Sequence, residues 1–220
     1  MNRLALFDCD GTLVDSGGTI HRALDATFRQ HDLHCPPRHE AQKVIGLSLE
    51  DAMAALAPDG DHGALAATYK DAFIAMRGAG TVEEPLFDGI AELLDELEAE
   101  GWLLGVATGK SLRGLKHCLA SHNFEDRFVT LQTADNNPSK PHPGMALAAM
   151  AETGASPTTT FFVGDTAWDM GCARAAGCAA VGAAWGYHTV AELRADGAGH
   201  VAERPSGVGP IARLLKEAMA

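Results

Sequence analysis

The feature that most constrains this chain is a series of short apolar runs separated by amphipathic segments. Each run stops at a glycine or at a polar residue, and each is too short for a typical helix. A strand of a parallel sheet is buried on both faces, so its sequence is a continuous apolar run. The alternation therefore predicts an α/β fold with a parallel sheet. The expected strands are residues 4–7, 102–107, 128–131, 160–163 and 178–181.

Signals for helix ends lie between these runs. Asp88 is the expected N-cap of a helix that Gly101 ends, and Pro143 is expected to start a helix that Gly154 ends. We expect a last helix from about residue 211, after a loop over residues 203–210. Capping boxes are expected at Ser48 with Asp51 and at Thr189 with Glu192.

Residues 16–84 interrupt the alternation because they carry only helical patterns. Ile20, Leu24 and Phe28 share one helix face, and similar faces occur within residues 49–56 and 65–73. This stretch is much longer than a crossover between parallel strands requires. We therefore expect a small helical bundle inserted into the sheet domain. The expected division is residues 1–15 and 85–220 for the α/β core, and residues 16–84 for the inserted domain.

The charge and cysteine content of the chain limit the partners and the compartment that we expect for it. The formal net charge is −12, which disfavours non-specific binding to nucleic acid and to anionic membranes. No apolar run approaches the ~18 residues of a membrane span, and the first residues do not form a signal peptide. The five cysteines form no CxxC pair, as expected for reduced thiols in a cytoplasmic protein. An anionic substrate would need a metal or local cations to offset the negative charge.

Polar clusters follow four of the strands, at the sheet edge where parallel α/β proteins bind ligands. The first contains Asp8 and Asp10, which are two positions apart on an extended chain and so face the same way. Cys9 between them should point to the opposite side and pack. The fourth contains Asp165 and Asp169, one helical turn apart, and paired carboxylates suit Mg²⁺.

The second and third clusters carry groups that suit an anion. Thr108 and Gly109 precede a helix, where a hydroxyl and free backbone N–H groups can bind a phosphate oxygen. Ser111 has the alternative role of an N-cap. Pro141 and Pro143 follow Lys140 and stiffen the backbone, which can hold the lysine in place, although an exposed loop lysine is the alternative interpretation.

In this order, the four clusters resemble those of the haloacid dehalogenase superfamily, over nearly the whole chain. The resemblance implies a Rossmann-like three-layer core and a helical cap of the C1 type over the active site. It also implies that Asp8 becomes an aspartyl phosphate, that Asp10 is the general acid and base, and that Thr108 binds phosphoryl oxygens with the Gly109 N–H group. Lys140 would neutralise charge. Magnesium would be held by Asp8, the Asp10 carbonyl group and Asp165, with Asp169 acting through water.

Among the activities of this superfamily, an aspartate at position 10 favours a phosphatase, because dehalogenases lack it and transport ATPases have threonine. The chain is most similar to phosphoglycolate phosphatases, which implies a small phosphorylated substrate and a monomer or homodimer. A phosphosugar mutase or a pyrophosphatase is the alternative within the superfamily, and a non-catalytic binding module is the alternative outside catalysis. Substrate specificity is expected in the cap, around Lys43, Gly46 and Ser48, although these residues also suit helix ends. The roles of His142 and His188 stay open.

Overall fold

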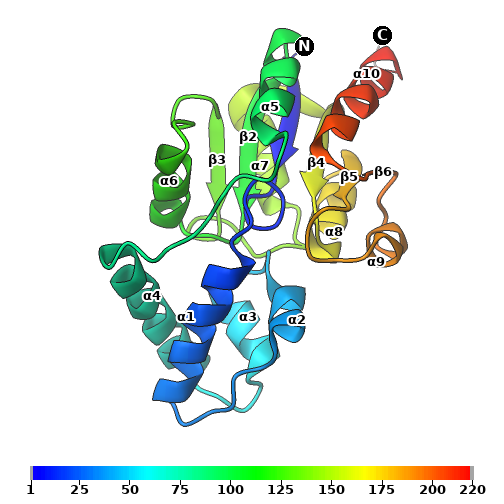
Figure 1. The fold of residues 1–220 in the computed structure, drawn as a ribbon. Helices are drawn as coiled ribbons and strands as arrows, with labels where there is room; N and C mark the ends of the chain where they lie inside the picture. The colour runs from blue at the N-terminus through cyan, green and yellow to red at the C-terminus, as the bar shows by residue number, and fades with distance from the viewer. Residues whose placement is uncertain (1, 219–220) are drawn as a thin grey trace.

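The computed structural model describes residues 2–218 and contains one six-stranded parallel sheet (Figure 1). The strand order is β3-β2-β1-β4-β5-β6, so β1 lies in the middle with β2 and β4 on its two sides. This confirms the parallel α/β prediction. The strands are β1 (Asn2–Phe7), β2 (Leu103–Thr108), β3 (Thr130–Thr133), β4 (Ala155–Gly164), β5 (Ala179–Ala183) and β6 (His200–Ala202).

Helices cover both faces of the sheet, which gives the three layers that the resemblance implies. Successive residues of β1 point to opposite faces: Ala5 and Phe7 pack into one apolar core, and Leu4 and Leu6 pack into the other. The first core is closed by α5 (Ile90–Ala99), α6 (Leu112–Ser121) and α10 (Val208–Ala218). The second is closed by α7 (Gly144–Thr153), α8 (Ala167–Ala175) and α9 (Val190–Ala195).

Residues 16–84 form helices without a strand, as expected, and these lie beyond the carboxyl edge of the sheet (Figure 1). They have an apolar core of their own, which includes Leu24, Phe28, Met53 and Leu65. The division of the chain at residues 16 and 84 stays a prediction. The helices are α1 (Gly17–Gln30), α2 (Arg38–Ala41), the 3-10 turn η1 (Gln42–Val44), α3 (Leu49–Leu56) and α4 (His62–Gly78).

Several predicted boundaries differ from the structure. Asp88 is not the N-cap of α5; Gly89 takes that place, with the left-handed φ of 89° that glycine tolerates. Strand β3 begins two residues later than expected. The predicted loop over residues 203–210 contains η2 (Pro205–Gly207) and the start of α10, because Pro210 lies in the first turn, where a missing N–H group costs little.

Other predicted ends are confirmed. Gly154 is the left-handed C-cap of α7, and Gly101, with a φ of 82°, follows α5. Thr189 and Glu192 form a complete capping box. None of the helices within residues 2–218 combines the length and the apolar character that crossing a bilayer requires.

Candidate active site

The polar clusters meet where the central strands end. Asp8 follows β1 and Asp165 follows β4, and because these strands are neighbours the two carboxylates lie close together. One turn into α8, Asp169 joins them. A carboxylate oxygen of each of the three residues lies within 4.8 Å of the others, and all three side chains are buried. The topology thus brings together side chains that lie far apart along the chain.

Asp8 is the least satisfied group of this cluster. Lys140 Nζ lies 3.0 Å from Asp8 Oδ1 as an ion pair, but neither Asp8 oxygen has a hydrogen-bond partner within residues 2–218. Burial raises the pKa of Asp8 to about 7; the positive charge of Lys140 opposes this shift and the negative charge of Asp169 adds to it. A buried carboxylate without a hydrogen-bond partner is costly even beside an ammonium group, so this oxygen-rich cluster fits a divalent cation such as Mg²⁺.

Asp165 is held in one orientation by groups from two loops. Its Oδ1 accepts a hydrogen bond of 2.8 Å from Thr12 Oγ1, and its Oδ2 accepts one of 2.9 Å from the Tyr187 N–H group. Burial raises the pKa of Asp165 well above its usual range, and the charges of Asp169 and Asp8 raise it further. A cation among these carboxylates would keep all of them ionised.

Lys140 contacts both Asp8 and Asp169 and is 1% exposed. Its Nζ donates a hydrogen bond of 2.6 Å to Asp169 Oδ1 and one of 3.3 Å to the Ala107 carbonyl oxygen. Burial lowers the pKa of this ammonium, but Asp169 and Asp8 raise it by more, so the net pKa is raised. Lys140 therefore keeps its positive charge beside Asp8.

Three glycines give the carboxylates their places, and the sequence analysis did not single them out. A Cβ atom at Gly11 would lie 2.3 Å from Asp165 Oδ2, and one at Gly186 would lie 2.2 Å from Asp165 Cβ. A Cβ atom at Gly164 would lie 2.3 Å from Asp169 Cβ. Only the adjacency of Gly11 and Gly164 to the acidic motifs could have signalled this packing.

Thr108 and Gly109 end β2 beside the cluster. Thr108 is 1% exposed, and its Oγ1 accepts a 3.3 Å hydrogen bond from the Lys110 N–H group. A Cβ atom at Gly109 would lie 2.1 Å from the Leu47 carbonyl oxygen, so the loop before α3 rests directly on this glycine. Ser111 is the N-cap of α6, which confirms its capping interpretation.

Asp10 faces a different set of partners. Its Oδ1 accepts hydrogen bonds from Ser16 Oγ at 2.6 Å and from Lys110 Nζ at 2.7 Å. Lys110 Nζ also lies 2.9 Å from Glu84 Oε1. Burial lowers the pKa of Lys110, but Asp10 and Glu84 raise it by more, and the net pKa lies well above the usual value. No local pattern in the sequence indicates the role of Lys110, because its partners are distant along the chain.

Comparison with known proteins identifies the family. The model of the haloacid dehalogenase-like hydrolase family matches residues 5–183. The chain belongs to this family. It is 36% identical over 204 residues to "Probable phosphatase IndB" of Dickeya dadantii, covering 89% of this chain and 86% of that protein. It is 30% identical over 186 residues to a phosphoglycolate phosphatase of Xanthomonas campestris, covering 84% of each.

Solved structures agree with this placement. A haloacid dehalogenase-like family hydrolase from Streptococcus pneumoniae superposes with a TM-score of 0.84 at 25% identity. The match covers 96% of this chain and 98% of that one. The whole architecture of this hydrolase, helical insert included, therefore has a counterpart in solved structures.

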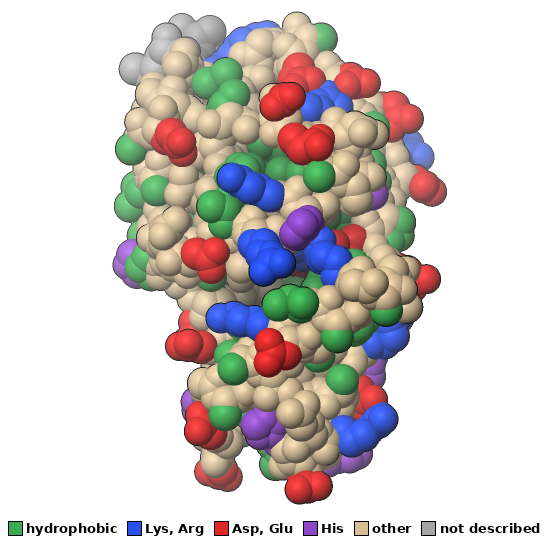
Figure 2. Space-filling model, turned by 90° about the vertical axis from the view of Figure 1, so that its left-hand side faces the viewer, with side chains coloured by type: hydrophobic (Ala, Val, Ile, Leu, Met, Phe, Trp, Pro, Cys, Tyr) green, Lys and Arg blue, Asp and Glu red, His purple; other side chains and the backbone are tan. Residues whose placement is uncertain are grey.

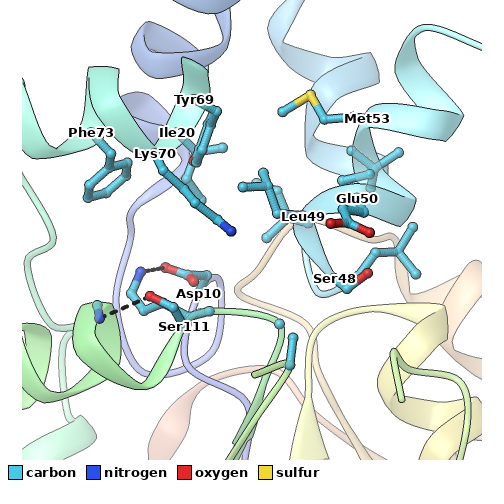
Figure 3. A pocket seen from close by; sticks show the side chains of 18 of the residues that line it. Asp10, Ile20, Ser48, Leu49, Glu50, Met53, Tyr69, Lys70, Phe73 and Ser111 are labelled. Atoms are coloured by element: carbon cyan, nitrogen blue, oxygen red, sulfur yellow. Dashed lines mark hydrogen bonds and ion pairs between the residues drawn. The ribbon is translucent and has the colours of Figure 1, made fainter. Parts of the chain in front are cut away.

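A chamber of about 850 Å³ separates the helical insert of the hydrolase from the sheet domain. Its floor includes Asp10 and Gly109, and Figure 3 shows Asp10 with its ion pair below the side chains of the helices. Arg77, Lys110 and Arg113 are among its lining residues. In Figure 2, Lys and Arg side chains gather where the two parts of the molecule meet. Two of these cations are paired within the protein, Lys110 with Asp10 and Glu84 and Arg77 with Glu84.

Of the three residues expected to set specificity, Gly46 and Ser48 line the chamber, whereas Lys43 is not among its lining residues. The Lys43 carbonyl oxygen accepts a 3.0 Å hydrogen bond from Trp168 Nε1. Gly46 has a φ of 99°. Ser48 is the N-cap of α3, but its N–H group donates to Ser139 Oγ at 2.8 Å, so the reciprocal half of the expected capping box is missing.

The two histidines left open in the sequence analysis bind backbone groups. His142 Nδ1 accepts a 3.0 Å hydrogen bond from the Gly144 N–H group at the start of α7. His188 Nδ1 accepts one of 3.2 Å from the Ala167 N–H group at the start of α8. Neither belongs to the three-carboxylate cluster formed by Asp8, Asp165 and Asp169.

Proposed function

We propose that this hydrolase is a magnesium-dependent phosphatase that cleaves the phosphomonoester of a small molecule through a phosphoryl–Asp8 intermediate. The observation that carries the proposal is the Asp8 carboxylate, which is fully buried, lacks a hydrogen-bond partner within residues 2–218 and lies beside Lys140 and two further carboxylates. The names of the two relatives described above support phosphatase chemistry, and one of them makes phosphoglycolate a natural first substrate to test.

In the first step, an Asp8 oxygen attacks phosphorus and the bond between phosphorus and the leaving oxygen breaks. Asp10 gives its proton to that oxygen, so the leaving group departs as a neutral alcohol. The Thr108 hydroxyl and the Gly109 N–H group bind the phosphoryl oxygens, and Lys140 offsets their charge. Magnesium would be held by Asp8, the Asp10 carbonyl group and Asp165, with Asp169 behind them. The ion would act as a Lewis acid on the phosphoryl group.

In the second step, Asp10 takes a proton from a water molecule that attacks the phosphorus of the intermediate. The bond between Asp8 and phosphorus breaks, and inorganic phosphate leaves. Because Asp10 is bound by Ser16 and Lys110 in this structure, its side chain must turn toward the leaving oxygen before it can act. Dividing hydrolysis into two displacements lets one acid-base residue serve both.

The test uses p-nitrophenyl phosphate, phosphoglycolate and simple alkyl phosphates, each with Mg²⁺ and with a chelator. We expect phosphate release that needs Mg²⁺ and that falls at least about a thousandfold in Asp8→Asn. Asp126→Asn is the matched control, because Asp126 is exposed and remote from the cluster. Acid quenching during turnover should leave one phosphoryl group on the Asp8 peptide. Full turnover by Asp8→Asn would refute the proposal.

A further inference from the structure

The chamber under the helical insert has a composition that points to the kind of molecule it receives. Its apolar or aromatic lining side chains from α1, α3 and α4 include Ile20, Leu49, Met53, Tyr69 and Phe73. Figure 3 shows them arranged around one space above Asp10. Its volume of about 850 Å³ falls within the range of about 300–1,000 Å³ typical of pockets that bury drug-sized ligands. A two-carbon acid would leave most of this space unfilled.

The position of Asp10 indicates which part of the substrate enters the chamber. Asp10 lines the chamber floor, whereas Asp8 is fully buried behind it and is absent from the lining. In the proposed reaction, Asp10 protonates the oxygen that leaves phosphorus. The carbon body attached to that oxygen must therefore extend from Asp10 into the apolar chamber.

The aromatic part of the wall is held in place by its neighbours. The rings of Tyr69 and Phe73 lie 5.9 Å apart between centroids. The Phe73 ring faces Lys110 Nζ at 5.8 Å and the Arg77 guanidinium at 5.6 Å. Lys110 contacts the Phe73 ring and also binds Asp10, so this one lysine links the aromatic wall to the floor of the chamber.

We infer that the substrate is a phosphomonoester of a sizeable apolar alcohol, with a ring or an alkyl body, and that phosphoglycolate is too small to use the chamber. This inference rests on the proposed function and specifies its substrate class. Lys70 extends into the same space in Figure 3 and offers one ammonium group to an oxygen on the apolar body. Leu49 is then a specificity-determining residue.

The experiment compares ethyl phosphate with 3-phenylpropyl phosphate, whose leaving alcohols have similar acidity, so that differences report on the carbon body. Each extra buried CH₂ group strengthens binding about fourfold. We expect kcat/KM to be more than about tenfold higher for the phenylpropyl ester. In Leu49→Ala this ratio should fall about fivefold, whereas Leu147→Ala, an exposed leucine on α7, should keep the wild-type ratio.

Binding of the matching phosphonates, which cannot be hydrolysed, separates this inference from the proposed function. By calorimetry, 3-phenylpropylphosphonate should bind more than about tenfold tighter than ethylphosphonate, with a more negative heat-capacity change. Turnover with a phenylpropyl-to-ethyl ratio near one would overturn the chamber assignment and leave the phosphatase proposal intact. Absence of turnover with every ester would refute the phosphatase proposal, and equal phosphonate affinities would overturn the chamber assignment independently.

Discussion

At the scale of single residues, the site depends on glycines that let backbone segments pack directly against its functional groups. Gly11, Gly164 and Gly186 let three backbone segments touch the carboxylates, and Gly109 lets the loop around Leu47 touch the end of β2. Local patterns in the sequence gave no reason why position 109 lacks a side chain. The structure supplies one, because any side chain there would meet the Leu47 carbonyl oxygen.

Gly109→Ala tests this contact. The added Cβ atom would lie 2.1 Å from the Leu47 oxygen, so the loop must move away from β2. We expect kcat/KM to fall at least about tenfold and the free energy of unfolding to fall by about 1–3 kcal/mol, as for overpacked positions. Steady-state kinetics and denaturant unfolding measure the two effects. The control is Gly18→Ala, where the nearest atom would be 3.9 Å away; wild-type kinetics in Gly109→Ala would contradict the argument.

The sequence predicted the clustered residues but not what holds them. Asp8, Lys140 and Asp165 were identified because carboxylates and a lysine follow apolar runs, and the structure brings them together. Their catalytic roles stay predictions. The ion pair of Lys110 with Asp10 depends on a contact between positions 100 residues apart, which no local pattern encodes.

At the scale of elements, the hydrophobic pattern identified some strands and helices correctly and missed or misplaced others. Strands buried on both faces were identified because their residues are uniformly apolar. Strand β6 was missed because it has only three residues, starts with a histidine and lies at the edge of the sheet. Helix α10 was placed too late because Pro210 and two glycines suggested a loop.

Two capping boxes allow a matched experiment on helix starts. Thr166 caps α8 and hydrogen-bonds Asp169 Oδ2 through its hydroxyl group at 2.6 Å, whereas Thr189 caps α9 and bonds the exposed Glu192. Replacing either threonine with alanine should cost about 1 kcal/mol of stability. Only Thr166→Ala also removes the hydroxyl hydrogen bond to Asp169 Oδ2, so we expect its kcat/KM to fall about tenfold or more.

Denaturant unfolding and steady-state kinetics on both variants check this expectation. Both variants lose one N-cap, so similar losses in the free energy of unfolding are expected, and a difference in activity then reports on Asp169. If Thr189→Ala lost as much activity as Thr166→Ala at similar stability, the positioning of Asp169 by the α8 cap would be wrong.

At the scale of the whole molecule, the buried cluster of Asp8, Asp165 and Asp169 predicts linkage between cation binding and stability. A ligand that binds only the folded state stabilises it by about 2.7 kcal/mol at a hundredfold excess over its Kd. We therefore expect saturating Mg²⁺ to raise Tm by about 5 °C or more relative to chelator. Asp165→Asn should lose most of this shift, and Asp126→Asn should keep it.

Differential scanning calorimetry at matched ionic strength measures the shift without relying on turnover. Sodium chloride in place of MgCl₂ corrects for general screening. An equal response of Asp165→Asn and the wild type would remove Asp165 from the cation site.

The strand order has a consequence for how the protein acquires activity. Thr12 and Asp165 are hydrogen-bonded although 153 positions separate them along the chain, and the intervening residues supply β2, β3 and the entire helical insert. No fragment that lacks β4 can contain both Asp8 and its acidic neighbours. On the proposed function, a nascent chain is inert until at least residue 169 has been synthesised, and recovery of catalysis during refolding reports the pairing of β1 with β4.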